Sequence, residues 1–271
     1  MTTVSVNNPS GSDEPVSQQS FGIGIIGLGG VALAHLQAFE LLDNLNIVSV
    51  CDVRADVAHT IDSRYDAKSY NDYHELLNDG GLDLVLVLTP AATHRDIVMA
   101  AANADVNVFC EKPLAITLAD GEAMVASCNN AGVKLFYGAS YRYLPAIVKA
   151  KQLIDTGILG EVQLMTEQVV GGHGLAGYQP LPPTHYPTGG PGGPGMGIVD
   201  HGVHLIDIFS WFTQSEIVRV QGKGQRSGEP AASEFMAMHF ANGAIGHLIY
   251  NAATYSTVLP NEGMYSGGQG W

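Results

Sequence analysis

Short apolar runs rich in β-branched residues alternate with stretches of helical spacing from Phe21 to about residue 140. The runs are FGIGIIG (21–27), NIVSVCD (46–52), DLVLVLT (83–89), NVFCEK (107–112) and VKLFYGAS (133–140), with a weaker one at KSY (68–70). Parallel strands need a long crossover connection, which is usually a helix. This order therefore predicts an α/β domain with a doubly wound parallel sheet.

The pattern changes after about residue 140. One helical stretch, LPAIVKAKQLIDTG (144–157), precedes the β-rich runs at 160–170 and 216–225 and a hairpin at 234–255 that turns at Ala241–Gly243. No crossover helix separates the last runs, so we expect a second α+β domain on a mostly antiparallel open sheet. The predicted division is a flexible polar tail at 1–20, a first domain at 21–140 and a second at 141–271.

A Gly- and Pro-rich loop is expected inside the second domain, at residues 171–197. So much glycine and proline does not form regular structure, and long loops within compact domains are usually functional or mobile.

The charge balance limits the classes of partner. The chain carries 26 acidic and 12 basic residues, a net charge of −14, with no Lys/Arg cluster to pair with phosphates. Nucleic acid and anionic membranes are therefore not expected as partners. No apolar run approaches the roughly 18 residues of a membrane helix. Cys51, Cys110 and Cys128 lack metal-type spacing, and the first 20 residues lack the features of a signal peptide, so we expect a cytoplasmic protein with reduced thiols.

A glycine-rich turn follows the first expected strand. In GIGIIGLGGVALAHL, Gly27 and Gly29 precede Ala32 in the pattern G-x-G-x-x-[GA], which binds a pyrophosphate at a helix N-terminus in Rossmann domains. Asp52 ends the second strand, where a carboxylate binds ribose hydroxyls, and Arg54 follows two residues later. The motif predicts NAD as the cofactor, with NADP possible through Arg54.

Two further motifs lie at the carboxyl ends of strands, the edge at which such sheets bind ligands. TPAATH (89–94) begins at the end of the fourth expected strand, counting the weak run KSY, and EKP (111–113) begins at the end of the fifth. Lys112 is therefore a candidate catalytic cation beside the bound cofactor.

In this order, the motifs resemble those of the Gfo/Idh/MocA oxidoreductases, the glucose-fructose oxidoreductase and inositol dehydrogenase group. The resemblance runs from GIIGLGG through TPAATH, EKP, YRYLPAIVKAKQLIDTGILGEV and GMGIVDHGVHLID to HFANGAIGHL. It implies an enzyme that binds NAD or NADP and oxidises a ring hydroxyl of a sugar or cyclitol, or reduces the ketone. Members usually continue for many tens of residues past the hairpin, so we expect this chain to be incomplete at its C-terminus.

The resemblance also assigns roles to residues. The catalytic group would be Lys112, Asp200 and His204. The residues expected to line the cofactor are Thr89, Pro90, His94, Glu111 and Lys112, with Arg142 near the nicotinamide. Substrate contacts are expected from Lys112, Asp200 and His204, and from two further candidates, Tyr141 and the loop residue His185.

A polar stripe crosses an otherwise apolar stretch, GIVDHGVHLIDIF (197–209). On a helix at about 100° per residue, Asp200, His204 and Asp207 fall within roughly 60° of one another, whereas His201 lies off that stripe. A carboxylate at i and a histidine at i+4 suit proton transfer. A metal site and a satisfied hydrogen-bond network in the core are the alternatives; we expect no metal, because no other ligand occurs nearby with motif-like spacing.

The sequence thus predicts an NAD(P)-dependent oxidoreductase acting on a small carbohydrate or cyclitol. The alternatives are an NAD-dependent glycosidase of the same superfamily, suggested by THYPTGG (184–190), and a non-catalytic dinucleotide-binding sensor. An uncovered sheet in the second domain would favour association, so a homo-oligomer paired through that domain is expected.

Overall fold

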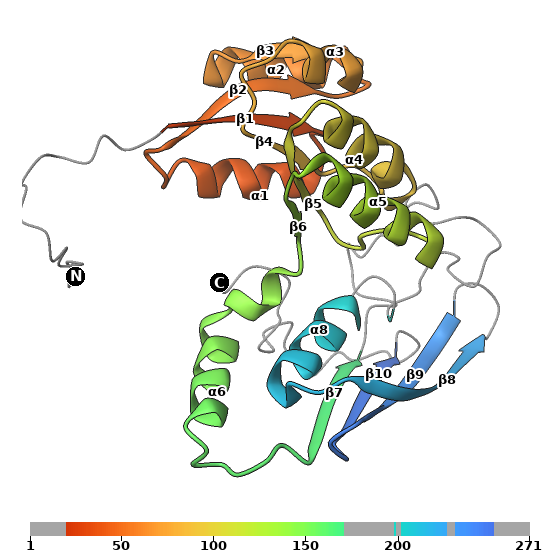
Figure 1. Ribbon diagram of the computed structural model, residues 1–271. Helices are drawn as coiled ribbons and strands as arrows, with labels where there is room; N and C mark the ends of the chain where they lie inside the picture. The colour runs from red at the N-terminus through yellow and green to blue at the C-terminus, as the bar shows by residue number, and fades with distance from the viewer. Residues whose placement is uncertain (1–19, 171–197, 199–201, 227–230, 252–271) are drawn as a thin grey trace, which may run out of the picture.

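The structure, a computed structural model, describes residues 20–170, 198, 202–226 and 231–251, which form two units with one sheet each (Figure 1). The expected polar tail, apart from Ser20, and the Gly/Pro-rich loop lie outside the described residues.

The first unit is built on a six-stranded sheet in the order β3-β2-β1-β4-β5-β6, with every pairing parallel. The strands are β1 Phe21–Ile26, β2 Leu45–Cys51, β3 Lys68–Tyr70, β4 Leu84–Val87, β5 Asn107–Cys110 and β6 Leu135–Tyr137. This is the strand order of a dinucleotide-binding doubly wound fold, and it confirms the predicted fold class. The strands β2 and β3 follow one another on one side of β1, and β4 to β6 follow on its other side. The strand order therefore reverses between β1 and β4, and such sheets bind ligands at this point.

Helices cover both faces of this sheet (Figure 1). They are α1 Gly30–Phe39, α2 Ala55–Tyr65, α3 Tyr73–Asn78, α4 His94–Asn103, preceded by the short η1 Ala91–Thr93, and α5 Leu118–Ala131. Successive residues of β4 explain the two layers, because side chains alternate between the faces of a strand. Val85 and Val87 pack with α3, α4 and α5, whereas Leu86 packs with α1 and α2.

The second unit begins after β6 with η2 Ser140–Tyr143 and α6 Pro145–Asp155. Its sheet has the order β7-β10-β9-β8, and its elements are β7 Leu164–Val170, α8 Gly202–Thr213, β8 Ile217–Arg226, β9 Ala231–Phe240 and β10 Ile245–Asn251. The expected mostly antiparallel sheet is confirmed, with one parallel pairing, between β7 and β10.

The helices α6 and α8 lie on one face of this second sheet (Figure 1). Ile147 of α6 and Leu205, Ile208 and Phe209 of α8 share a core with strand residues such as Met238. Gly246 of β10 allows this close packing, because a Cβ atom there would lie 2.7 Å from the Phe209 ring. The sequence around Gly246 therefore fixes where α8 docks.

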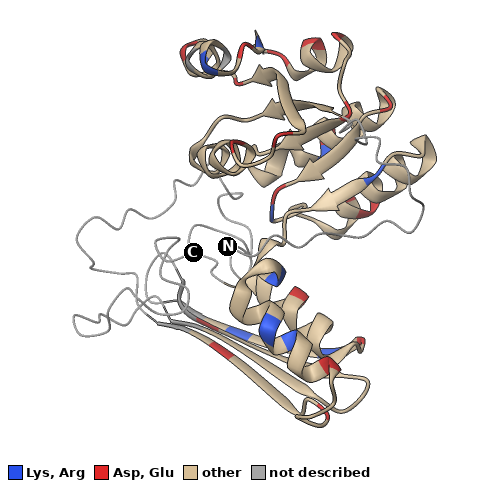
Figure 2. Ribbon diagram, turned by 90° about the vertical axis from the view of Figure 1, so that its left-hand side faces the viewer, with Lys and Arg blue, Asp and Glu red and all other residues tan. Residues whose placement is uncertain are grey.

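Acidic and basic residues are scattered over the described helices and strands (Figure 2). Within the described part of the chain, no helix is both long enough and apolar enough to span a bilayer.

Candidate active site

The glycine turn between β1 and α1 has the geometry that a bound dinucleotide requires. Gly27 adopts a φ of +91°, and a Cβ atom there would lie 2.9 Å from the carbonyl carbon of Leu88. Added Cβ atoms at Gly29 and Gly30 would instead meet open space, and no side chain caps the start of α1. The uncapped N–H groups at this helix start can therefore receive an anion such as a pyrophosphate. Ala32 is buried in the core and lets α1 approach the sheet.

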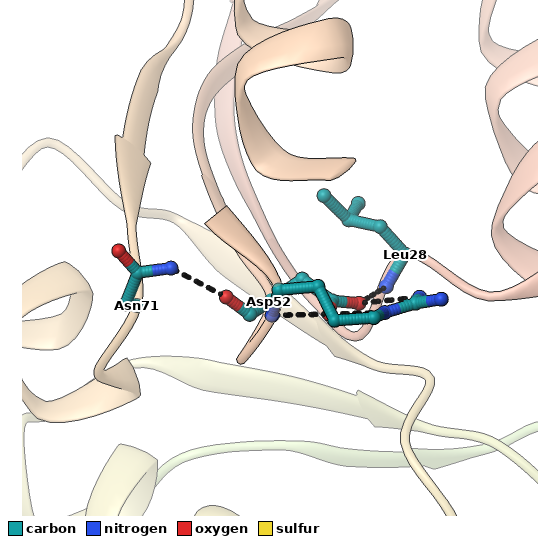
Figure 3. Close-up of polar contacts among 4 residues, drawn as sticks. Leu28, Asp52 and Asn71 are labelled. Atoms are coloured by element: carbon teal, nitrogen blue, oxygen red, sulfur yellow. Dashed lines mark hydrogen bonds and ion pairs between the residues drawn. The ribbon is translucent and has the colours of Figure 1, made fainter. Parts of the chain in front are cut away.

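Asp52, at the end of β2, is hydrogen-bonded to this turn (Figure 3). Its Oδ2 accepts a hydrogen bond from the Leu28 N–H at 2.9 Å, and its Oδ1 accepts from the Arg54 N–H at 2.9 Å and from Arg54 Nε at 3.1 Å. The side chain of Asn71 donates to the Asp52 carbonyl at 2.9 Å. Burial raises the pKa of Asp52, but the hydrogen bonds from Arg54 and Leu28 outweigh it, so the net pKa lies below its usual value. The Asp52 carboxylate is thus fixed at the end of β2 and paired with Arg54, and its expected contact with the ribose stays a prediction.

His94 differs from its expected place. We expected it to line the cofactor, but its side chain is fully buried. Its Nε2 lies 2.7 Å from the Thr89 carbonyl oxygen, and its Nδ1 lies 3.2 Å from that of Leu114. These carbonyls hold the ring inside the protein because buried ring nitrogens need partners. His94 therefore joins the segment after β4 to the segment after Pro113 from behind the site.

Thr89 and Pro90 do lie at the carboxyl end of β4, as expected. The Thr93 hydroxyl donates to Thr89 Oγ1 and lies 2.8 Å from both this atom and the Pro90 carbonyl oxygen. This arrangement fixes the turn into η1 beside the glycine turn.

Glu111 and Lys112 follow β5. The Oε1 of Glu111 lies 3.2 Å from Nε2 of His35 on α1, and its Oε2 accepts a hydrogen bond from the Lys112 N–H at 2.8 Å. Burial raises the pKa of Glu111, whereas the hydrogen bonds with His35 and the Lys112 N–H lower it. The lowering is the larger effect, so the net pKa is below its usual value. The Lys112–Pro113 peptide bond is cis, and Gly138 approaches closely, since a Cβ atom there would lie 3.1 Å from Glu111 Cα.

His35 is a site residue that the sequence analysis missed. It lies on α1 and reaches a carboxylate 76 residues away. Helical spacing places it in the same helix as the glycine motif, but gives no indication of its partner.

His204 lies on α8 and is buried. The ring of Tyr141, from η2, stacks on it with the ring centroids 3.9 Å apart and the planes 6° from parallel. Asp200, His201 and His185 lie outside the described residues, so the expected pairing of Asp200 with His204 stays a prediction.

Asp207 lies one helical turn beyond His204 and binds Arg142. Both guanidinium contacts are short, with Nε 2.5 Å from Oδ2 and Nη2 2.6 Å from Oδ1. Arg142 also lies over the Trp211 ring, with Cζ 5.3 Å from the ring centroid. The side chain of Arg142, expected near the nicotinamide, is thus held by α8, and its cofactor role stays a prediction.

Tyr137 was also missed, although it ends β6 at the ligand-binding edge of the first sheet. Its pKa is raised to about 12, first by partial burial and then by the negative charges of Asp207 and, to a smaller extent, Glu111. The segment that follows β6 links the two groups of expected catalytic residues, because Gly138 lies against Glu111 and Tyr141 stacks on His204.

Comparisons with known proteins agree with this architecture. The oxidoreductase family with an NAD-binding Rossmann fold, GFO_IDH_MocA, matches residues 21–139, and the GFO/IDH/MocA C-terminal domain matches residues 147–261. Myo-inositol 2-dehydrogenase of Thermotoga maritima is 35% identical over 144 residues, which are 53% of this chain and 43% of that protein. Inositol 2-dehydrogenase of Salmonella paratyphi B is 32% identical over 202 residues, 73% of this chain and 56% of that protein.

Among solved structures, the aldose-aldose oxidoreductase of Caulobacter crescentus, complexed with glycerol, superposes with a TM-score of 0.75 at 25% identity. The match covers 88% of this chain and 72% of that one. The chain spans about half the length of the curated relatives it matches. Since the two family matches together cover most of the chain, it belongs to the GFO/IDH/MocA family of oxidoreductases.

Proposed function

We propose that this protein is an NAD(P)-dependent dehydrogenase that oxidises a ring hydroxyl of a sugar or cyclitol, or reduces the corresponding ketone. The observation that carries the proposal is the short segment after β6, in which Gly138 lies against Glu111, the neighbour of Lys112, and Tyr141 stacks on His204. It supports a single site formed by the cofactor edge of the first sheet and by α8.

The residues divide the chemistry between them. The Gly27–Gly30 turn would hold the pyrophosphate, and Asp52 the adenosine ribose. When bound, the nicotinamide supplies the hydride acceptor in the oxidative direction. His204 takes the proton of the substrate hydroxyl, Lys112 polarises the substrate oxygen, and Asp200 orients both.

The substrate class rests on the relatives. Two of them are named inositol 2-dehydrogenases and one is an aldose-aldose oxidoreductase, and their likeness to this chain supports a polyhydroxylated ring as substrate. For the cofactor, the ionised Asp52 favours NAD over NADP because a 2′-phosphate would be repelled by it.

A screen of cyclitols and aldoses with NAD and NADP tests the proposal, followed by absorbance of the reduced cofactor and by product analysis. We expect one ring polyol to yield net NADH and a ketone or lactone. Lys112→Met should lower turnover by about 10²–10⁴-fold without preventing NADH binding, whereas Lys134→Met, at an exposed lysine, should not. Cleavage of a glycoside without net NADH, or binding of NADH with no turnover of any polyol, would overturn it.

We also propose that the protein is a homo-oligomer that pairs through the face of the second sheet opposite α6 and α8. Strand register places Leu164 and Phe235 on that face, and both side chains are exposed, by 62% and 39%. Exposed apolar residues on a sheet face favour association. A cytoplasmic location is proposed from the three cysteines, which are all free and buried thiols.

A further inference from the structure

We propose that Tyr141 is a positioning residue for His204. The ring of Tyr141 forms a flat π surface that stabilises the protonated imidazole of His204 formed during turnover. The proposal also assigns the Arg142–Asp207 ion pair as the contact that holds Tyr141 in place. It rests on the proposed function, because it concerns the proton that His204 takes from the substrate.

The geometry of the stack suits a charged ring better than a neutral one. The two centroids are only 3.9 Å apart and the planes are nearly parallel, at 6°. Neutral aromatic pairs prefer offset or edge-to-face arrangements with centroids 4.5–7 Å apart, because two negative faces repel each other. A cation over the face of a tyrosine ring is attracted by the same quadrupole. The arrangement is therefore complementary to the imidazolium form of His204.

The stack is fixed by a second contact between the same two segments. Tyr141 and Arg142 are consecutive in η2, and their partners His204 and Asp207 are one helical turn apart on α8. Arg142 binds Asp207 with two hydrogen bonds, a fork geometry that leaves little rotational freedom. Fixing Arg142 in this way fixes the backbone of the neighbouring Tyr141 and so limits how its ring can shift.

Charged groups also lie on α8 and on the strands that pack against it. On its own helix, Asp207 is paired with Arg142. From the sheet below, Glu167 of β7 and Glu234 of β9 share the helix-facing side with Leu248 of β10, and Glu234 accepts a hydrogen bond from the Ile198 N–H at 2.9 Å.

Lys112, on the cofactor side, and Asp200, outside the described residues, complete this set in the proposed site. All of these groups remain when Tyr141 is replaced. A comparison of variants at Tyr141 alone therefore isolates the contribution of its ring.

The proton balance defines the step at which the ring acts. In the oxidative direction, the substrate O–H bond breaks as the hydride leaves the carbinol carbon for the cofactor, and the proton moves to the imidazole of His204. The products are a ketone, reduced cofactor and an imidazolium that later releases its proton to water. Stabilising that imidazolium favours the proton transfer.

The test is a titration of His204 by NMR in the full chain, without substrate, with its signal assigned by its loss in His204→Asn. Tyr141→Leu removes the π surface, so the titration midpoint should fall by about half a pH unit. Tyr141→Phe keeps the ring and serves as the matched control, with a midpoint close to that of the wild type. Tyr141→Met is a second variant without a ring, and it gives an independent measurement in case Tyr141→Leu misfolds.

The same variants report on turnover. The low-pH limb of the kcat profile should move with the NMR midpoint in Tyr141→Leu. An unchanged midpoint in both variants without a ring, or an equal shift in Tyr141→Phe, would overturn the proposal. Because the titration needs no substrate, failure of the proposed enzymatic function would appear separately, as absent turnover in a protein whose His204 titrates as expected.

Discussion

Arg142 and Asp207 are 65 residues apart in the chain and form a bidentate ion pair with contacts of 2.5 and 2.6 Å. The pair ties the segment that leaves the first sheet to the helix that carries His204. Because both side chains are partly buried, the contact contributes to both the stability of the fold and the geometry of the site.

Replacing one member of this pair should lower the free energy of unfolding more than breaking an exposed ion pair does. Asp207→Asn leaves a partly buried guanidinium without its counter-charge, so we expect a loss of about 1–2 kcal/mol in the free energy of unfolding, between the values for exposed and buried pairs. Asp96→Asn, which breaks the exposed contact with Arg95, is the matched control and should cost at most about 0.5 kcal/mol. Urea denaturation measures both, and equal losses would contradict the structural role assigned to Arg142.

Local rules predicted the parts of the fold that depend on neighbouring residues. The turn at Gly27 could be found because a strand, a tight turn and a helix N-terminus require glycine at fixed positions. The strand at 83–89 and its flanking helices could be found from their apolar patterns in the same way.

Contacts between distant segments could not be found in this way. Hydrophobic periodicity indicates which side chains are buried but not which partner they meet, so the pairing of His35 with Glu111 had no signal in the sequence. His94 was expected at the cofactor surface, yet two backbone carbonyls that only the folded chain brings together hold it inside. The parallel pairing of β7 with β10 likewise depends on topology and not on local pattern.

The contact between Asp52 and Arg54 predicts the cofactor preference. We expect NADH to bind more tightly than NADPH, by at least about tenfold, because the ionised Asp52 repels a 2′-phosphate. Asp52→Asn should narrow this gap, since asparagine keeps an oxygen for the Leu28 N–H but carries no charge. Arg54→Ala should weaken NADPH further, because Arg54 is the nearby cation. Fluorescence titration of both reduced cofactors checks these changes, and tighter NADPH binding by the wild type would reverse the assignment.

The lowered pKa of Glu111 predicts a stabilisation that depends on pH. A carboxyl group whose pKa is lower in the folded than in the unfolded state contributes stability above its unfolded pKa of about 4.3, and this is lost as the pH falls through the folded value. The wild type should therefore be more stable than Glu111→Gln at pH 7 and 5, and the difference should shrink below about pH 4. Urea denaturation at each pH measures it. A difference that stays constant down to pH 3.5 would rule out this electrostatic origin.

The exposed face of the second sheet predicts the assembly state. We expect light scattering to give a homo-oligomer, and Phe235→Glu to yield monomers because it places a charge on the proposed contact face. Val53→Glu is the matched control, since Val53 is 88% exposed but lies in the first unit. A wild-type chain that stays monomeric over a wide concentration range would remove the proposed interface.

The proton-transfer role expected of the polar stripe at 200–207 and the alternative of a metal site diverge when His204 is replaced and when a chelator is added. If His204 is the general base, His204→Asn should lower turnover by about 10²–10⁴-fold while leaving NADH affinity nearly intact, and a chelator should have no effect. The described residues contain no group of three His, Cys, Asp or Glu side chains placed to hold a metal ion, but Asp200 and His201 lie outside them.

His201→Asn is therefore the decisive control for this question. Helical spacing places His201 off the stripe of Asp200, His204 and Asp207, so its replacement should leave turnover within a few-fold of the wild type. If a metal instead joined Asp200, His201 and His204, both variants should be equally impaired, chelation should abolish activity, and added divalent ions should restore it. Turnover of the wild type and both variants, each with and without chelator, separates the two mechanisms. Loss confined to His204→Asn and insensitive to chelator supports proton transfer, whereas activity that a metal restores would replace it with a metal site.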